Sequence, residues 1–586
     1  MKASMPFLRG FILALSFLAA PLCLAQGVSL APEADSGRSE KGLAVSHEYM
    51  VAAAHPLAAE AGREILRKGG SAVDAAIAVQ MVLGLVEPQS SGLGGGAFIV
   101  HWDETAKAVT AIDGRETAPA SATPARFLDA SGAPIPFDTA VRSGLSVGVP
   151  GVLRALELAH KKFGKLPWAA LFEPARKLAR EGFPVGARLN ALLKIEGPDR
   201  FSKAARDYFF DETGAPRAPG ALLRNSAYEA TLAKIAQEGA KALYEGEIAQ
   251  GIVDAVAQAP FAQGGMTIED VRGYQAKERD AACFTYRRRK ICGMPPPSSG
   301  TLTVAQTLKL IEPLGGIEGA NARMSPQAVH LIAEAQKLAF ADRNRFIADP
   351  DFVTVPHGLL DAGYLEERRN LISRARAMDK PQAGMPPGVS KRTYGIDSTH
   401  EQPGTSHISI VDAEGNAVAM TTTIESAFGS RLMTHGFLLN NELTDFSFKP
   451  AGDDGVPAAN RVEGGKRPRS SMAPLVMFDP GGKLYAVTGS PGGSRIILFM
   501  VKTLVALIDW DMDARESAAL ENFGSEGGPL QLETGASDFW IALVLKTYGH
   551  QVVHVAMTSG VHTIVRRDRH LEGGADPRRE GVALGD

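Results

Sequence analysis

The sequence has few cysteines and almost no net charge. Its 586 residues contain three cysteines, with no Cys-x-x-Cys and no Cys/His spacing, which excludes the common zinc modules. No HExxH and no P-loop motif occurs either, so no metal or organic cofactor is implied. The formal net charge of -3 offers no electrostatic reason to expect nucleic acid as a partner. A small-molecule substrate is the partner we expect.

Long hydrophobic runs are also absent, except at the N-terminus. Lys2 and Arg9 flank the start of an apolar run over residues 11–24, which is shorter than the ~20 residues of a spanning helix. Cys23-Leu24-Ala25 suits signal-peptidase cleavage. We predict a signal peptide over residues 1–25, export to the periplasm or medium, and no membrane association. A membrane anchor is the alternative interpretation of this run.

Two cysteines remain after residue 25. Cys283 and Cys292 flank FTYRRRKI, and a hairpin that turns at Arg287-Arg288 would place them opposite each other. In an oxidising compartment they could form a disulfide. The alternative is a pair of buried thiols, and both interpretations are structural.

Capping signals predict two helices near the start of the mature chain. Pro56 suits a first helical residue, and Gly69-Gly70 suits the end of that helix. Ser71 with Asp74 forms a capping box for a second helix, which runs to about Leu85. Both are rich in alanine and other apolar residues, so we expect core helices.

Residues 92–97, GLGGGA, formally match a dinucleotide fingerprint. A true fingerprint follows a strand and opens a helix, whereas this run follows a helix and opens the strand AFIVHW. We interpret these glycines as a place where the backbone passes close to a pocket.

Helical periodicity dominates residues 150–280. A further long amphipathic helix is predicted from Ser325-Pro326 to about residue 345, with its charged residues mostly on a solvent face. The segment Met294–Gly300, MPPPSSG, predicts a stiff turn that packs near the functional site. The simpler alternative is a turn with a structural role only.

The stretch around Gly404-Thr405 marks a change of character. Residues 381–404 lack apolar periodicity and predict an exposed loop. A strand, a turn and a second strand then follow over residues 406–423, and Gly415-Asn416 are expected to supply positive φ angles. If Val411 pairs with Ala417, Thr405 lies opposite Thr423.

Several polar motifs surround this hairpin in the sequence. Arg115, in a turn after a strand, is either a surface charge or a guanidinium aimed at a substrate carboxylate. Downstream lie residues 438–446, 467–472 and 489–495, which contain paired acids, adjacent serines and paired glycines. Such groups can hold an ammonium, donate hydrogen bonds and present backbone N–H groups to an oxyanion.

Taken together, these motifs resemble the gamma-glutamyltranspeptidase family of N-terminal nucleophile hydrolases. The resemblance runs from about His47 to the C-terminus. It rests on GGSAVDAAIA at 69–78, EPQSSGLGGGAF at 87–98, DGRETAP at 113–119, MPPPSSG at 294–300, TSH at 405–407, NNELTDFS at 440–447, RSSM at 469–472 and GSPGGSRI at 489–496.

The resemblance implies an α+β fold, a four-layer αββα sandwich. It also implies a precursor cleaved between Gly404 and Thr405 into a large subunit, residues 26–404, and a small catalytic subunit, residues 405–586. Both subunits would form one αββα unit, a heterodimer of the two cleavage fragments. The freed α-amino group, with an ordinary pKa of roughly 7.7–8.0, would activate the weak threonine nucleophile.

Site roles follow from the resemblance position by position. The catalytic residues would be Thr405 as nucleophile, Thr423 as its hydrogen-bonding partner, and the amides of Gly492 and Gly493 as oxyanion hole. Arg115, Ser470 and Ser471 would hold the α-carboxylate of a γ-glutamyl group, and Glu442 and Asp445 its α-ammonium. The acyl group would pass to water or to an amino acid or peptide acceptor, with glutathione as an example of a donor.

His407 and Glu425 lie near the predicted nucleophile in the sequence, but the motifs do not settle their roles. His407 faces the same way as Thr405 on a strand and invites a role as base, but the α-amine already fills that role. Glu425 departs from the family, which usually has asparagine there. It would add a third carboxylate around the ammonium, and the three acids would couple their titrations, with one protonated or turned away.

Two other functions stay open. One is an acylase of the same fold that accepts glutaryl or other acyl amides, as in related cephalosporin acylases, although the three acids suit a substrate with an amine. The other is an uncleaved periplasmic binding protein that kept the pocket without catalysis.

Overall fold

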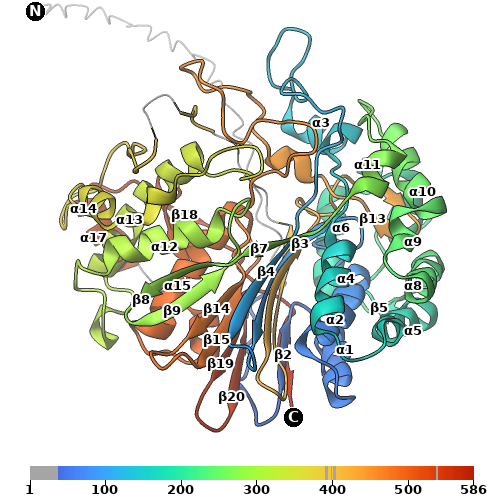
Figure 1. Ribbon diagram of the computed structural model, residues 1–586, viewed down its shortest axis with the longest axis horizontal. Coiled ribbons are helices and arrows are strands. Elements are labelled where there is room, and N and C mark those ends of the chain that lie inside the picture. Colours follow the sequence, from blue (N-terminus) through green and yellow to red (C-terminus); the bar gives the residue numbers. More distant parts are fainter. Residues whose placement is uncertain (1–36, 390–392, 398, 400, 402–403, 536–538) are drawn as a thin grey trace, which may run out of the picture. The chain divides into compact units, whose positions relative to one another are not determined.

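Two seven-stranded sheets form the centre of the protein (Figure 1). The computed structural model describes residues 37–389, 393–397, 399, 401, 404–535 and 539–586, so the predicted signal peptide lies outside the described residues. One sheet has the order β21 (Val582–Gly585), β2 (Met50–Ala53), β10 (Thr405–Val411), β11 (Ala417–Thr423), β3 (Gly96–Asp103), β4 (Ala108–Gly114) and β7 (Lys277–Asp280). The other has the order β1 (Ala44–Ser46), β20 (Leu571–Ala575), β19 (His562–Arg566), β15 (Leu484–Gly489), β14 (Leu475–Phe478), β9 (Arg289–Gly293) and β8 (Ala282–Tyr286).

Alternating side chains of the β10 sheet enter two different cores. Val51 and Ala53 of β2 pack with α1 (Pro56–Arg67), α2 (Ala72–Val86) and α4 (Val152–Phe163). Met50 and Ala52 pack in the core that the second sheet shares with α12 (Gly300–Ile311), α13 (Pro326–Phe346) and α15 (Ile496–Ile508). Because successive strand residues point to opposite faces, the layers are helix, sheet, sheet and helix, as Figure 1 shows. The predicted αββα sandwich is confirmed.

Local signals read from the sequence are mostly confirmed. Pro56 opens α1, and Ser71 and Asp74 form the capping box of α2, whose residues are all buried. The predicted helical region contains α4, α5 (Glu173–Glu181), α6 (Ala187–Glu196), α7 (Lys203–Phe209), α8 (Ser226–Glu238), α9 (Lys241–Tyr244), α10 (Gly246–Ala257) and α11 (Ile268–Gly273). Among the described residues, no helix is long and apolar enough to cross a membrane.

The cysteine hairpin forms in the predicted register. Cys283 of β8 pairs with Cys292 of β9, and the two are joined in a disulfide with a Cα–Cα distance of 4.1 Å. Arg287 and Arg288 form its turn, with φ angles of 47° and 66°. The sequence had left a disulfide and two free thiols as alternatives, and the structure contains the disulfide.

One prediction of solvent exposure is wrong, and another holds only in part. The charged residues of α13 do not form a solvent face, because Glu334, Asp342 and Arg343 are all buried and paired. The loop before Thr405 is not exposed throughout, since Asp397 and Glu401 have exposed fractions of 1% and 7%. In both cases buried cations supply the counter-charge that makes burial of the carboxylates tolerable. Lys337 pairs with Glu334, and arginines pair with Asp342, Asp397 and Glu401.

Candidate active site

Thr405 and Thr423 face each other at one end of the β10–β11 hairpin. The two strands pair from Val411 with Ala417 to Thr405 with Thr423, so the predicted register is confirmed. The hydroxyl oxygens lie 3.4 Å apart, and Thr423 Oγ1 donates to the carbonyl oxygen of Gly404 at 2.9 Å. The nucleophile candidate, its partner and the carbonyl that precedes it therefore share one hydrogen-bonded chain.

The turn of this hairpin differs from its prediction in one detail. Gly415 takes a positive φ of 86°. Asn416 contributes its side chain instead, and its Nδ2 donates to Asp412 Oδ2 at 3.1 Å. Asp412 in turn accepts from the backbone N–H of Asn416. One residue with a positive φ and the hydrogen bonds to Asp412 are therefore sufficient to form this hairpin turn.

Glycines around the hairpin are required by close backbone contacts. A Cβ at Gly404 would lie 1.8 Å from the carbonyl oxygen of Glu425, and one at Gly95 would lie 2.0 Å from that of Thr423. The interpretation of the 92–97 run as a close passage is supported, because Gly94 and Gly95 lie between a helix and β3 and touch strand ends at the site.

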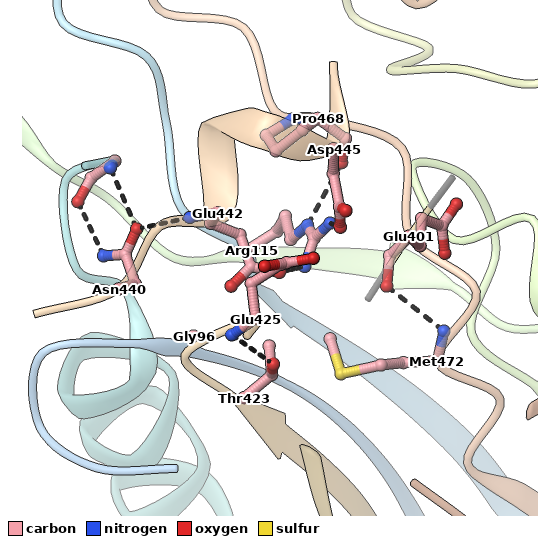
Figure 2. Close-up of polar contacts among 12 residues, drawn as sticks. Gly96, Arg115, Glu401, Thr423, Glu425, Asn440, Glu442, Asp445, Pro468 and Met472 are labelled. Carbon is pink, nitrogen blue, oxygen red and sulfur yellow. Dashed lines mark hydrogen bonds and ion pairs between the residues drawn. The ribbon is translucent and has the colours of Figure 1, made fainter. Parts of the chain in front are cut away.

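Arg115 lies between two acids in the uncleaved chain (Figure 2). Its Nη1 pairs with Glu442 Oε1, and its Nη2 lies 2.6 Å from Asp445 Oδ2. Its Nε and Nη2 also donate to the carbonyl oxygens of Pro468 and Arg469, at 3.1 and 2.8 Å. The predicted carboxylate ligand thus pairs with the two predicted ammonium ligands, while Glu442 Oε2 and Asp445 Oδ1 stay buried without a hydrogen-bond partner in the part of the chain that the structure describes.

Burial and like charge raise the pKa values of these acids. For Glu442 and Asp445, desolvation is the largest cause, and neighbouring carboxylates add to it while Arg115 opposes it. Burial also raises the pKa of Glu116 to about 8. Glu116 follows Arg115 directly and was not singled out from the sequence, although its place in the DGRETAP motif could have indicated it.

Glu425 points into the same cluster and has a positive φ of 76°. Its Oε2 accepts from Ser426 Oγ at 2.5 Å and from Asn441 Nδ2, and its charge raises the pKa of both Glu442 and Asp445. The expected coupling of three acids is therefore present, with Glu116 as a further member.

Ser470 and Ser471 lie beside the predicted stiff turn. Ser470 donates its backbone N–H to the carbonyl of Pro297 at 3.0 Å and accepts at its own carbonyl from Ser299 N at 2.7 Å. Ser471 Oγ accepts from Nη2 of Arg343 at 2.6 Å. The prediction that Met294–Gly300 packs near the site is confirmed.

Glu401 is an unexpected member of the site. Its Oε1 pairs with Arg343 Nη2 and lies 3.6 Å from Arg469 Nε. Burial alone would raise the pKa of Glu401, but the two arginines lower it below its ordinary value. Sequence reasoning missed both Glu401 and Arg343, because nothing local to either residue signals their pairing.

Gly492 and Gly493 have positive φ angles of 140° and 58° at the start of a short 3-10 turn before α15. Successive residues in such conformations can present backbone N–H groups to one point. Gly493 lines the same small pocket as Thr405, which is where an oxyanion hole is needed.

These side chains enclose one pocket with a volume of about 10 Å³, room for about one water molecule. We call it the Thr405 pocket. It is lined by Arg115, Glu401, Thr405, Thr423, Glu425, Glu442, Asp445, Ser470, Ser471, Met472, Gly493 and Ile496. A larger cavity of about 550 Å³ is lined by residues of β7, by Pro295 and Pro296 of the Met294–Gly300 turn, by Leu302 and by residues between Pro350 and Leu360. None of these residues has a catalytic or substrate-binding role in the prediction.

His407 is not one of the residues that line the Thr405 pocket. Its Nδ1 lies 2.8 Å from Thr421 Oγ1, and its Nε2 lies 3.0 Å from Ser409 Oγ. Burial, with a smaller effect of His562, holds the pKa of His407 well below its ordinary value. A neutral histidine bonded to two hydroxyls suits a structural role.

Two buried cations support the nucleophile strand. Arg579 Nη1 donates to the carbonyl oxygen of Thr405 at 3.3 Å. Ser406 Oγ donates to Glu87 Oε2 at 2.7 Å, and Glu87 pairs with Arg188. These contacts fix the first two residues of β10 and come from segments far away in the sequence.

One group of side chains has the composition of a metal site. His330, Glu334 and His550 lie close together. His330 Nε2 lies 2.7 Å from the carbonyl of Ser373, so Nε2 carries the proton and Nδ1 accepts from His550 at 2.7 Å. Lys337 donates to Glu334 at 2.9 Å. The ligand atoms are thus engaged with one another and with a cation, and we assign no metal.

Comparisons with known proteins find relatives along almost the whole chain. The family model for gamma-glutamyltranspeptidase matches residues 58–586. The glutathione hydrolase proenzyme of Bacillus subtilis (strain 168) is 36% identical over 561 residues, which cover 93% of this chain and 92% of the relative. The acylase ACY 1 proenzyme of Pseudomonas sp. (strain V22) is 35% identical over 559 residues, 93% and 95% of the two chains.

Solved structures share the fold. The crystal structure of cephalosporin acylase from Bacillus halodurans superposes with a TM-score of 0.81 at 25% identity, covering 95% of this chain and 99% of the other. The similarity therefore extends over both sheets and both helical layers.

Proposed function

The chain belongs to the gamma-glutamyltranspeptidase family, and we propose that it is an autoprocessing enzyme that cleaves γ-glutamyl amides through an acyl-enzyme on Thr405. The glutamyl group would pass to water or to an amino acid or peptide. Glutathione is one donor of this class, and relatives named glutathione hydrolase support it.

One observation carries the proposal. Thr405 Oγ1 lies 3.4 Å from Thr423 Oγ1, and the Thr423 hydroxyl donates to the carbonyl of Gly404. The Thr405 hydroxyl can attack that carbonyl carbon while Thr423 polarises it. As an ester to Thr405 Oγ1 forms, the amide C–N bond breaks and the hydroxyl proton passes to the departing nitrogen, which becomes the α-amine of Thr405. Water then hydrolyses the ester, which restores the Thr405 hydroxyl and releases Gly404 as a carboxylate.

The same groups would serve the donor reaction. The α-amine, with an ordinary pKa of roughly 7.7–8.0, accepts the proton of the Thr405 hydroxyl as it attacks the γ-carbonyl. The N–H groups of Gly492 and Gly493 stabilise the oxyanion. The amide leaving group departs protonated, and water or an acceptor amine then releases the glutamyl group.

Substrate binding would use the remaining polar groups. Glu442, Asp445 and Glu425 suit the α-ammonium of the donor, and Ser470 and Ser471 suit its α-carboxylate, with Arg115 positioned between the two sets. The excess of acids over cations around Arg115 favours a donor that brings a positive charge.

We further propose that residues 1–25 are a cleaved signal peptide and that the protein is exported. The Cys283–Cys292 disulfide supports this, because such bonds persist in oxidising compartments. The mature enzyme would be a heterodimer of residues 26–404 and 405–586.

An acylase of glutaryl amides is the second candidate, because both an acylase proenzyme and a cephalosporin acylase are similar to this chain. The two donors differ by one ammonium group, and the acid cluster favours the donor that has it.

The test is a denaturing gel with an activity assay. Wild-type protein should give two fragments, and Thr405→Ala should remain one chain without activity. The wild type should release p-nitroaniline at least tenfold faster from γ-glutamyl-p-nitroanilide than from glutaryl-p-nitroanilide, since an unpaired buried acid costs about 1–3 kcal/mol. An intact, inactive wild type would indicate a binding protein instead, and a faster glutaryl reaction would indicate the acylase.

A further inference from the structure

The uncleaved chain holds a carboxylate of its own in the Thr405 pocket. Glu401 lies four residues before Thr405, and its side chain lines the pocket together with Ser471 and Thr405. Its partner is Arg343 of α13. Arg343 Nη2 contacts both Glu401 Oε1 and Ser471 Oγ, so a single arginine joins the carboxylate to one of the serines predicted to bind the substrate's carboxylate.

Arg115 and Arg343 differ in the charged groups that surround them. Arg115 is neutralised by Glu442 and Asp445, and both of these acids lie after the cleavage point. Apart from Glu401, the direct partners of Arg343 are uncharged: Nε donates to Ser299 Oγ at 2.8 Å, Nη1 donates to Asn344 Oδ1 at 2.8 Å, and Nη2 reaches Ser471. Arg469 also lies near Glu401, at 3.6 Å, but it pairs with Asp397 at 2.9 Å as well. Among the described residues, Glu401 is the one carboxylate that pairs directly with Arg343.

Cleavage at Gly404 leaves Glu401 three residues from a new chain end, no longer tied to β10. When Glu401 leaves, Arg343 becomes a buried cation without a paired charge, and such a group is costly unless an anion replaces the lost one. The pocket beside it, about 10 Å³ in the uncleaved chain, gains the volume of the departed side chain.

We propose that Arg343 binds the α-carboxylate of the donor, and that Glu401 occupies this position until cleavage releases it. Arg343 is then a specificity-determining residue for donors that carry a carboxylate beside the amine. The proposal rests on the proposed γ-glutamyl function and deepens it. Glu401 acts as an internal competitor that keeps the uncleaved chain from binding donor.

The first experiment compares donors that differ by one group. γ-Glutamyl-p-nitroanilide has both ammonium and carboxylate, and 4-aminobutyryl-p-nitroanilide lacks only the carboxylate. Arg343→Met should lower kcat/KM for the γ-glutamyl donor by about 10-fold to 100-fold, mainly through KM. The binding free energy of a hydrogen bond to a charged group corresponds to a change of this size. It should leave kcat/KM for the 4-aminobutyryl donor within about threefold, and Arg343→Lys should restore part of the loss.

Arg368→Met is the matched control, since Arg368 is also buried but pairs with Asp342 and the carbonyl of Gln382, outside the Thr405 pocket. Arg368→Met should change kcat/KM for both donors by the same factor. An equal loss on both donors for Arg343→Met would show a structural role and overturn the proposal, as would no loss on either. A wild type that cleaves neither donor would overturn the proposed function itself.

A second experiment does not depend on maturation of the Arg343 variants. In the uncleaved Thr405→Ala chain, L-glutamate should give no thermal stabilisation, whereas Thr405→Ala with Glu401→Ala should be stabilised. Exposed Glu366 provides the control, and Glu366→Ala in the same background should not respond. Stabilisation of Thr405→Ala itself, or none with Glu401→Ala, would contradict the role of Glu401 as a competitor.

Discussion

Arg115 occupies the space between Glu442 and Asp445 in the uncleaved chain, with each acid on one end of its guanidinium. The zwitterionic donor that we propose would need cations and acids close together, and in the uncleaved chain these groups pair with one another. Arg115 compensates part of the negative charge in this small buried pocket, and the raised pKa values of Glu116, Glu442 and Asp445 reflect the part that it leaves uncompensated.

Thr423 provides the most direct test at the residue scale. Thr423→Val should slow fragment formation by about 100-fold, because it removes the hydroxyl that donates to the Gly404 carbonyl. Thr423→Ser should keep most of the rate. The measurement is a time course of cleavage on denaturing gels.

Thr422→Val is the matched control, since the Thr422 hydroxyl donates to Gly96 on the neighbouring strand at 3.2 Å. It should mature at nearly the wild-type rate. If Thr423→Val also matured normally, Thr423 would have no part in cleavage.

The raised pKa of Glu116 predicts that the stability of the fold depends on pH. Its pKa is raised to about 8 in the folded chain, above the ordinary value of about 4.3. The folded state therefore holds this proton more tightly, and the associated stability is complete below about pH 4 and is lost as the pH rises toward 8. The loss has a slope of up to about 1.4 kcal/mol per pH unit.

Glu116→Gln in the Thr405→Ala chain should remove this part of the slope, so its melting temperature should fall less between pH 5 and pH 8 than that of Thr405→Ala alone. Exposed Glu366→Gln serves as control and should leave the slope unchanged. Identical slopes for all three chains would show that Glu116 titrates normally.

At the scale of elements, the β10–β11 hairpin and α13 illustrate different limits of sequence reading. The hairpin register follows from loop length and strand alternation, which are local. The exposure of α13 does not follow from its own pattern, because residues from the 397–401 segment and α14 (Ala362–Arg369) supply partners for its buried charges.

The β8–β9 hairpin lies at the edge of its sheet, and its disulfide should stabilise the fold without affecting chemistry. Replacing Cys283 and Cys292 together by serine should lower the free energy of unfolding by about 2–3 kcal/mol, as expected for a short closed loop. The kcat for a γ-glutamyl anilide should stay unchanged. Denaturant unfolding and steady-state kinetics measure the two effects, and a large fall in kcat would place this hairpin in the catalytic machinery.

At the scale of the whole molecule, each sheet combines strands from both sides of Gly404. β10 and β11 lie between β2 and β3, and β8 and β9 share a sheet with β14, β15, β19 and β20. Separation of residues 26–404 from 405–586 would leave several strands without partners for their backbone groups.

We therefore expect the two fragments to remain together after cleavage. Cleaved wild type and uncleaved Thr405→Ala should elute at the same volume in size-exclusion chromatography, and a tag on one fragment should retain the other until denaturant is added. Separate elution of the fragments under native conditions would contradict the shared-sheet architecture.

The sequence alone determined the fold class, the hairpin that pairs Thr405 with Thr423, the capped helices α1 and α2, and the register of Cys283 with Cys292. These features depend on periodicity, turn chemistry and capping over short separations, and on motifs that mark a family. Tertiary structure alone decided which charges are buried and with which partners. Arg343 and Glu401 meet across 58 positions of sequence, and the pKa of Glu116 is raised by its burial beside other acids, because desolvation and charge pairing depend on the packed neighbourhood of a group and not on its sequence neighbours.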